Sequence, residues 1–270
     1  MITSTSNSQV KNLVLLGKKA KARREQGVFL AEGRKMFEEA PKDWIDKVYI
    51  SESYFLEEGK EALPADIPYE LLADHVFKCA AGTQSPQGIL TVVRIPKWDV
   101  ADVIPFGASQ NGRQDTAAKA AGCLLLENIQ DPGNLGTILR TAEGAGITAV
   151  IASRTTVDLY NPKTVRATMG SIYRVPFVAA DDFYAVLSQM RECGIKLYAA
   201  HLKGSVPYDQ PDYTSSCAFL IGNEGNGLTE EAANLADANI KVPMEGKVES
   251  LNAAVTAAIL MYEMNRQRRG

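Results

Sequence analysis

Runs of apolar residues alternate regularly with segments of helical spacing in the second half of the chain. Strands that are apolar throughout, rather than at alternate positions, are typical of a parallel sheet covered by helices on both faces. The segments between the runs, notably 134–143, 182–193 and 228–235, have the spacing of such covering helices. We therefore expect an α/β domain that is doubly wound around a parallel sheet. Its expected strands are 123–126, 147–151, 175–178, 195–199, 217–221 and 240–242, and a last helix is expected over 251–266.

The first part of the chain, up to Pro96, alternates less regularly between short helical and extended segments. Helical spacing covers 10–21 and 34–39, and extended runs cover 28–31 and 47–50. The β-branched residues of 88–93 favour a closing strand. This pattern predicts a second, smaller α/β domain.

The stretch between these two parts is rich in Gly, Ser, Asn, Gln, Asp and Ala and has no apolar period that could bury a face. A chain of 270 residues is also long enough for two domains. We therefore expect a smaller domain at 1–96, a linker at 97–121 and the larger domain at 122–270.

The composition is ordinary for a soluble globular protein, with 46% apolar and 23% charged residues. No apolar run approaches the roughly 18 residues of a membrane span, and the first ten residues lack the plan of a secretory signal. The sequence therefore predicts a cytoplasmic protein without a membrane partner. No metal site is expected, because the four cysteines are far apart and the two histidines lack ligand spacing.

A basic cluster near the start of the chain stands out against the net charge of −3. Such a cluster either forms a solvated helix face or contacts RNA phosphates, and charge alone favours the solvated face. Its members are Lys11, Lys18, Lys19, Lys21, Arg23 and Arg24.

Three polar turns follow apolar runs in the second half: 128–140, which opens into a helix, then 222–227 and 249–252. Turns at the carboxyl ends of parallel strands are where α/β proteins bind ligands. The spacing Gly222-x-x-Gly225-x-Gly227 is not GxGxxG, and no P-loop occurs, so a nicotinamide-dependent oxidoreductase is disfavoured.

In this order, the three turns resemble the motifs of the SpoU/TrmH family of S-adenosylmethionine-dependent RNA ribose 2′-O-methyltransferases, in the SPOUT superfamily. The similarity extends from about Leu124 to Glu263 and includes the segment 163–171. The first part of the chain is similar to the L30e-like substrate-binding domain that precedes many such enzymes. The motifs are Asp131-Pro132-Gly133-Asn134-Leu135-Gly136 through Arg140, then Gly222-Asn223-Glu224-Gly225-Asn226-Gly227, and Val242-Pro243-Met244 followed by Ser250-Leu251-Asn252.

The resemblance implies a deep trefoil knot that contains the second and third motifs and binds the methyl donor, S-adenosylmethionine, in a bent form. It also implies a homodimer, with the donor site beside an interface formed partly by the first and last helices of the larger domain. The residues expected to line the donor pocket are Gly222, Val242, Met244 and Leu251.

Methyl transfer to a ribose hydroxyl requires that two substrates be aligned and that a hydroxyl of high pKa be deprotonated or polarised. Asn134, Glu224, Ser250 and Asn252 are expected to supply hydrogen bonds for the alignment. The family assigns Arg140 the role of catalytic base. A guanidinium with a pKa above about 12 loses a proton reluctantly, so Arg140 is also expected to hold phosphate or stabilise an alkoxide.

Each of these residues also has a purely structural interpretation. Asn134 and Ser250 are suited to cap helices, and Glu224 to stabilise a turn. Their joint occurrence at family positions favours a site. Arg166 is expected either to contact an RNA phosphate or to pair with a carboxylate, and His201 either to lie near the donor or, preferably, in a solvated loop.

The sequence thus predicts a 2′-O-methyltransferase acting on folded RNA, with ribosomal RNA of the 23S type ahead of transfer RNA as substrate. A catalytically silent RNA-binding protein on the same fold is the alternative of a different class. The residues expected to contact RNA are Lys18, Lys19, Arg23, Arg24 and Arg166.

Overall fold

The computed structural model describes residues 1–59, 67–104 and 120–269, and the chain divides into two compact units. The first unit contains Met1–Lys97 together with Asp158–Tyr173, and the second contains Trp98–Val157 together with Arg174–Gly270. The central part of the expected linker, 105–119, lies outside the described residues. The segment 158–173 packs with the first unit, although the sequence assigned it to the larger domain at 122–270.

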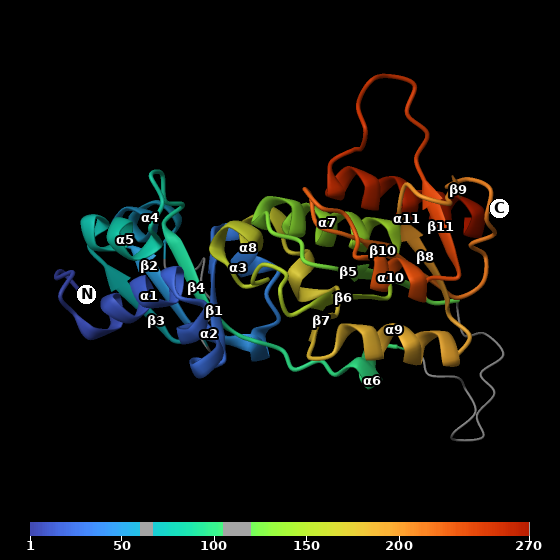
Figure 1. The fold of residues 1–270 in the computed structure, drawn as a ribbon. Helices are drawn as coiled ribbons and strands as arrows, with labels where there is room; N and C mark the ends of the chain where they lie inside the picture. Colours follow the sequence, from blue (N-terminus) through green and yellow to red (C-terminus); the bar gives the residue numbers. More distant parts are fainter. Residues whose placement is uncertain (60–66, 105–119, 270) are drawn as a thin grey trace. The chain divides into compact units, whose positions relative to one another are not determined.

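The first unit is a four-stranded mixed sheet with helices around it (Figure 1). Its strand order is β1-β4-β2-β3, with β4 antiparallel to both of its neighbours and β2 parallel to β3. The predicted small α/β unit is therefore present. Its elements are α1 (Ser8–Lys18), α2 (Ala20–Gln26), β1 (Val28–Glu32), α3 (Arg34–Glu38), η1 (Lys42–Trp44), β2 (Ile45–Ser51), α4 (Glu52–Glu58), β3 (Tyr69–Leu72), α5 (Asp74–Ala81) and β4 (Ile89–Arg94), with α8 (Pro162–Thr168) and η3 (Ser171–Tyr173) from the later segment.

The helix expected over 10–21 is interrupted. Helix α1 begins after Asn7, whose side chain accepts a hydrogen bond from the Gln9 backbone N–H at 2.8 Å. It ends at Lys18, because Lys19 has extended backbone angles of φ −121° and ψ 111°, and α2 starts afresh at Ala20. The basic cluster therefore lies on two short helices and on Lys19 between them.

Buried contacts hold the segment 158–173 inside the first unit. Arg23 is only 3% exposed and donates to Asp158 Oδ2 from Nε at 3.0 Å and from Nη2 at 2.5 Å. The ring of Tyr160 lies 4.9 Å from that of Phe29, centroid to centroid. The expectation that Arg23 contacts RNA is therefore wrong, because its guanidinium is buried in an ion pair within the unit.

The second unit is the predicted doubly wound domain, built on a seven-stranded sheet. Its order is β7-β6-β5-β10-β8-β11-β9, and every neighbouring pair is parallel. Its elements are α6 (Val100–Val103), β5 (Gly122–Leu126), α7 (Pro132–Ala145), β6 (Ala149–Ser153), β7 (Phe177–Ala180), α9 (Phe183–Glu192), β8 (Lys196–Ala200), β9 (Val206–Pro207), β10 (Cys217–Ile221), α10 (Glu230–Leu235), β11 (Ala238–Lys241) and α11 (Ala253–Arg269).

Helices cover both faces of this sheet. Helices α7 and α11 pack together on one face, and α9 and α10 lie on the other (Figure 1). Successive side chains of a strand point to opposite faces, so an apolar side chain is needed at each of the positions 123–126 of β5. Cys123 and Leu125 belong to the core cluster that contains residues of α9, and Leu124 and Leu126 are equally buried.

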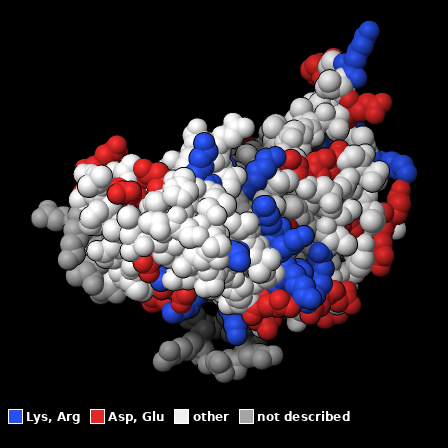
Figure 2. Space-filling model, turned by 90° about the vertical axis from the view of Figure 1, so that its left-hand side faces the viewer, with Lys and Arg blue, Asp and Glu red and all other residues white. Residues whose placement is uncertain are grey.

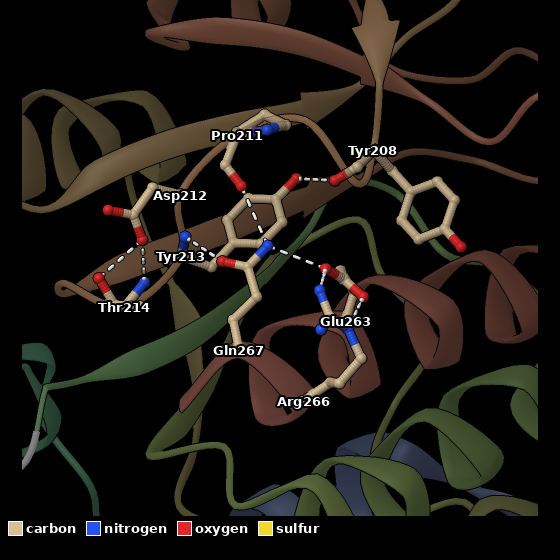
Figure 3. A network of polar contacts seen from close by, with 8 residues as sticks. All are labelled: Tyr208, Pro211, Asp212, Tyr213, Thr214, Glu263, Arg266 and Gln267. Carbon is tan, nitrogen blue, oxygen red and sulfur yellow. Dashed lines mark hydrogen bonds and ion pairs between the residues drawn. The ribbon is translucent and has the colours of Figure 1, made fainter. Parts of the chain in front are cut away.

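The last turns of α11 anchor the loop between β9 and β10 (Figure 3). Gln267 Nε2 donates to the Pro211 carbonyl at 3.1 Å, and Gln267 Oε1 accepts from the Tyr213 backbone N–H at 2.8 Å. The buried Tyr213 in turn donates from its hydroxyl to the Tyr208 carbonyl at 2.5 Å. These contacts hold the C-terminal end of α11 against the loop. No helix of the described chain is long and apolar enough to cross a membrane.

Candidate functional site

A cavity of about 580 Å³ lies among the loops that leave the carboxyl ends of β8, β10 and β11. This is the edge where parallel sheets bind ligands, and the volume is within the roughly 300–1,000 Å³ of small-molecule sites. The four residues expected to line a donor pocket, Gly222, Val242, Met244 and Leu251, all line this cavity.

The loop after β10 is folded too tightly for a side chain at Gly222. A Cβ atom there would lie 2.2 Å from the Gly227 carbonyl carbon and from the Leu228 nitrogen. The Asn223 and Gly227 backbones exchange N–H···O bonds of 3.0 and 2.9 Å, and Gly227 has a φ of +69°. The glycine spacing therefore encodes a closed loop that presents backbone groups to the cavity.

Side chains from the three sequence motifs form one hydrogen-bonded chain. Asn134 Nδ2 donates to Glu224 Oε1 at 2.9 Å, and Asn252 Nδ2 donates to Asn134 Oδ1 at 3.0 Å. An ionised carboxylate only accepts hydrogen bonds, so it fixes which end of the Asn134 amide faces it. Asn134, Glu224 and Asn252, called the motif cluster below, are thus brought together although 118 residues separate the first from the last.

Glu224 remains ionised within the motif cluster. Burial by itself would raise the pKa of this carboxyl, but hydrogen bonds from the Asn134 amide and the Gln130 and Asp131 backbone N–H groups outweigh it and lower the pKa below its ordinary value. The carboxylate is therefore suited to hold its donors in place rather than to deliver a proton.

The capping roles considered for Asn134 and Ser250 belong to other residues. Asp131 caps α7, because its Oδ1 accepts from the Asn134 backbone N–H at 2.8 Å. Asn252 caps α11, because its Oδ1 accepts from the Ala254 backbone N–H at 2.9 Å. The Asn134 amide is thereby free for the motif cluster, and the exposed Ser250 lines the cavity.

Arg140 is apart from the motif cluster within this chain. It lies six residues beyond Asn134 on α7, about 9 Å along the axis and on a different side of the helix. Its side chain is exposed and has no hydrogen bond or ion pair with another described residue. The guanidinium is therefore available to a group outside the subunit.

Sequence reasoning favoured a solvated loop for His201, but this residue lines the cavity. Its Nδ1 is buried and has no hydrogen-bond partner in the described parts of the chain. Beside it on the cavity wall, Lys203 Nζ pairs with Glu230 Oε1 at 2.8 Å. In the sequence, only the position of His201 just after an expected strand indicated that it could lie near the donor.

The remaining predicted RNA contacts differ in exposure. Lys18, Lys19 and Arg24 are exposed. Arg166 pairs with Glu32 at 3.2 Å while 49% of its side chain stays exposed. The face drawn in Figure 2 carries basic and acidic side chains close together, so its charge is mixed rather than uniformly basic.

Two sequence families match the chain. The SpoU rRNA Methylase family matches residues 122–262, and the MRM3-like substrate binding domain matches residues 7–91. The first match contains the cavity and the motif cluster.

Curated and solved relatives agree with these matches. The 23S rRNA (guanosine(2553)-2′-O)-methyltransferase RlmP of Bacillus subtilis is 34% identical over 97% of this chain and 98% of its own length. An AdoMet-bound rRNA methyltransferase from Sinorhizobium meliloti is 30% identical, with a TM-score of 0.83 over 98% of this chain and 97% of that one. The AdoMet complex of the SpoU methyltransferase AviRb from Streptomyces viridochromogenes has a TM-score of 0.83 at 25% identity, over 98% and 99% of the two chains.

The cavity suits the donor that two of these relatives bind: its glycine loop exposes backbone groups, and the buried Nδ1 of His201 lacks a partner in the described chain. The trefoil knot is implied by the same fold. The chain belongs to the SpoU rRNA methylase family of S-adenosylmethionine-dependent RNA 2′-O-ribose methyltransferases.

Proposed function

We propose that this protein methylates a ribose 2′-hydroxyl in ribosomal RNA of the 23S type. The observation that carries the proposal is the motif cluster, Asn134–Glu224–Asn252, joined by hydrogen bonds of 2.9 and 3.0 Å beside a cavity lined by the predicted donor residues. The 23S specificity rests on the Bacillus subtilis relative, which matches nearly the whole chain. We propose a cytoplasmic location on the same grounds.

Some residues of the cavity bind the donor, and others align the substrate with it. When bound, S-adenosylmethionine supplies a methyl group activated by a sulfonium charge. Backbone groups of the loop at Gly222 and the apolar side chains of Val242, Met244 and Leu251 hold the donor. The ionised Glu224 keeps the Asn134 amide oriented, while the Ser250 hydroxyl, which has no partner among the described residues, faces the substrate.

In this proposal Arg140 binds the RNA phosphate next to the target ribose and stabilises negative charge that develops on the 2′-oxygen. Because Arg140 lies on a different side of α7 from Asn134, we assign it to the substrate of a partner subunit. A guanidinium, which does not give up its proton in proteins, suits this electrostatic role better than proton removal.

The homodimer that this assignment requires would bury an exposed apolar side of α11. Val255 and Tyr262 are 47% and 48% exposed and lie two helical turns apart, on one side of the helix. We expect Val255→Glu with Tyr262→Glu to convert a dimer into a monomer in sedimentation equilibrium. Leu56→Glu, at a residue 77% exposed in the first unit, is the matched control and should leave the dimer intact. A parent protein that is monomeric at all concentrations would refute the assignment.

The substrate is tested by transfer of labelled methyl from S-adenosylmethionine to unmodified ribosomal RNA and, in parallel, to bulk transfer RNA. Alkali-resistant 2′-O-methyl sites are then mapped. Label at one ribosomal ribose is the expected result. Label in transfer RNA alone would keep the reaction and overturn the substrate, and donor binding without label in either RNA would favour the silent RNA-binding protein.

The exposed part of the basic cluster is proposed to contact RNA phosphates. Replacing Lys18, Lys19 and Arg24 by glutamine should weaken RNA binding and reduce the slope of log K against log salt by up to about 2–3, since each lost phosphate contact accounts for about 0.7–0.9. Filter binding at several salt concentrations measures this slope. The control variant carries the same charge change at exposed positions of the same unit: Lys35, Lys42 and Lys78. Equal slopes for the two variants would mean that the cluster is a solvated helix face and does not contact RNA.

A further inference from the structure

Two adjacent residues that follow β5 contact the two ends of the loop that follows β10. Strands β5 and β10 are parallel neighbours, with Leu126 opposite Ile221. The Glu127 backbone N–H continues this pairing and donates to the Ile221 carbonyl at 2.9 Å. The segments that follow β5 and β10 therefore begin side by side. Glu127 and Asn128, at the end of β5, contact the loop 222–229, which follows β10.

Glu127 holds the far end of the loop. It is 5% exposed, and its Oε2 accepts from the Thr229 backbone N–H at 2.8 Å. Its Oε1 accepts from the hydroxyl groups of Thr229 at 2.8 Å and Tyr184 at 2.7 Å. The Thr229 hydroxyl also accepts from the Ala232 N–H at 3.1 Å, which caps α10. A buried carboxylate without an ion pair in the described chain depends on these donors.

Asn128 holds the near end. Its backbone is left-handed, with φ 60°, a conformation that non-glycine residues rarely adopt and that persists where surrounding contacts determine it. Its N–H donates to Ser153 Oγ at 2.9 Å, and its carbonyl accepts from Asn223 Nδ2 at 2.9 Å. Asn223 Oδ1 accepts from the Gly225 N–H at 2.9 Å, so the amide is fixed on both sides.

We propose that Glu127 and Asn128 are positioning residues that act as a clip: together they fix both ends of the loop 222–229 and thereby place its backbone and Glu224 for donor binding. The residues Glu224 to Leu228, which lie between the contacts at Asn223 and Thr229, line the cavity. This inference rests on the proposed role of the cavity as the donor site.

Replacing Glu127 by alanine removes both hydrogen bonds between this carboxylate and Thr229 and is expected to raise the Kd for S-adenosylmethionine at least tenfold. Tyr184→Phe is the matched control: it removes the hydroxyl that donates to Glu127 Oε1 and lies 3.3 Å from Thr229 Oγ1, but it keeps both hydrogen bonds between Glu127 and Thr229. It should leave the Kd within about twofold. Isothermal titration with S-adenosylmethionine measures both. An equal loss of affinity in the two variants, or no loss in Glu127→Ala, would overturn the clip.

Hydrogen exchange in the donor-free protein gives a readout that is independent of the proposed function. In Glu127→Ala the amides of Gly227 and Thr229 should exchange at least tenfold faster, while those of Leu125 and Leu220 in the central strands keep their protection. Uniform loss of protection would mean general destabilisation and would refute a positioning role. If the parent protein failed to bind the donor, the proposed function would be wrong. The exchange rates would still show whether Glu127 orders the loop.

Three further variants keep the test decisive should Glu127→Ala fail to fold. Thr229→Val removes the hydroxyl at the loop end, and Thr229→Ser restores it; the first should reproduce the loss of donor affinity and the second should bind like the parent. At the near end, Asn128→Gly keeps the carbonyl and tolerates a positive φ, so it should also bind like the parent. Parental affinity in Thr229→Val would contradict the proposal.

Discussion

Replacement of Arg140 by alanine is expected to lower the rate of methyl transfer by at least about 10²–10³-fold, the usual cost of removing one group that stabilises transition-state charge. Donor binding should be nearly unaffected, because Arg140 is exposed on α7 and does not line the cavity. The fold should also tolerate the change, since the side chain has no partner among the described residues. Single-turnover transfer and titration with S-adenosylmethionine separate the two effects.

The control for Arg140→Ala is Arg154→Ala, which removes another exposed arginine of the same unit, one that is paired with Asp181. This variant should transfer methyl at the parental rate. A fully active Arg140→Ala would remove Arg140 from the mechanism. Arg140→Lys discriminates between a point charge and the planar fork of donors, because only the guanidinium can hold a phosphate through two parallel hydrogen bonds.

In the proposed homodimer, mixed dimers decide whether Arg140 acts on the partner's substrate. Homodimers of Arg140→Ala and of Glu224→Ala should both transfer methyl far more slowly than the parent. In a mixed dimer, action across the interface would restore one site, which combines the intact Glu224 of one subunit with the intact Arg140 of the other. Action within one subunit would leave both sites defective and the mixture inactive.

Gly222→Ala is expected to weaken donor binding by at least about 100-fold, or about 2.7 kcal/mol. The added Cβ would lie 2.2 Å from two backbone atoms, the Gly227 carbonyl carbon and the Leu228 nitrogen. Backbone atoms in a closed loop cannot rotate away as the end of a side chain can, so the loop must open. Titration with S-adenosylmethionine measures the loss, and amide exchange in the loop reports the opening.

Gly225→Ala is the matched control three residues away. A Cβ at Gly225 would meet Asn223 Oδ1 at 3.5 Å, an ordinary van der Waals contact, so this variant should retain parental affinity. If Gly222→Ala also bound the donor like the parent, the tight loop would not be what shapes the site. If both variants lost affinity equally, the defect would be a general intolerance of side chains in the loop.

Local pattern determined the architecture of the second unit and the composition of its site. Strands that are apolar at every position need cover on both faces, which dictates a parallel sheet between helical layers. Parallel strands in turn deliver their following loops to one edge, so the three motif turns were bound to converge. The four predicted pocket residues accordingly line one cavity, and Asn134, Glu224 and Asn252 join in one hydrogen-bonded chain.

Tertiary structure alone decided which polar side chains are committed to partners. Arg23 belongs by sequence to a basic cluster, but its partner Asp158 lies 135 residues away and buries the guanidinium. The same kind of distant pairing joins Glu127 to Thr229 across 102 residues. Periodicity and spacing report which face of an element is apolar, because that depends on neighbours within two turns. Which donor meets which acceptor depends on how separate elements pack, and only the folded chain determines that.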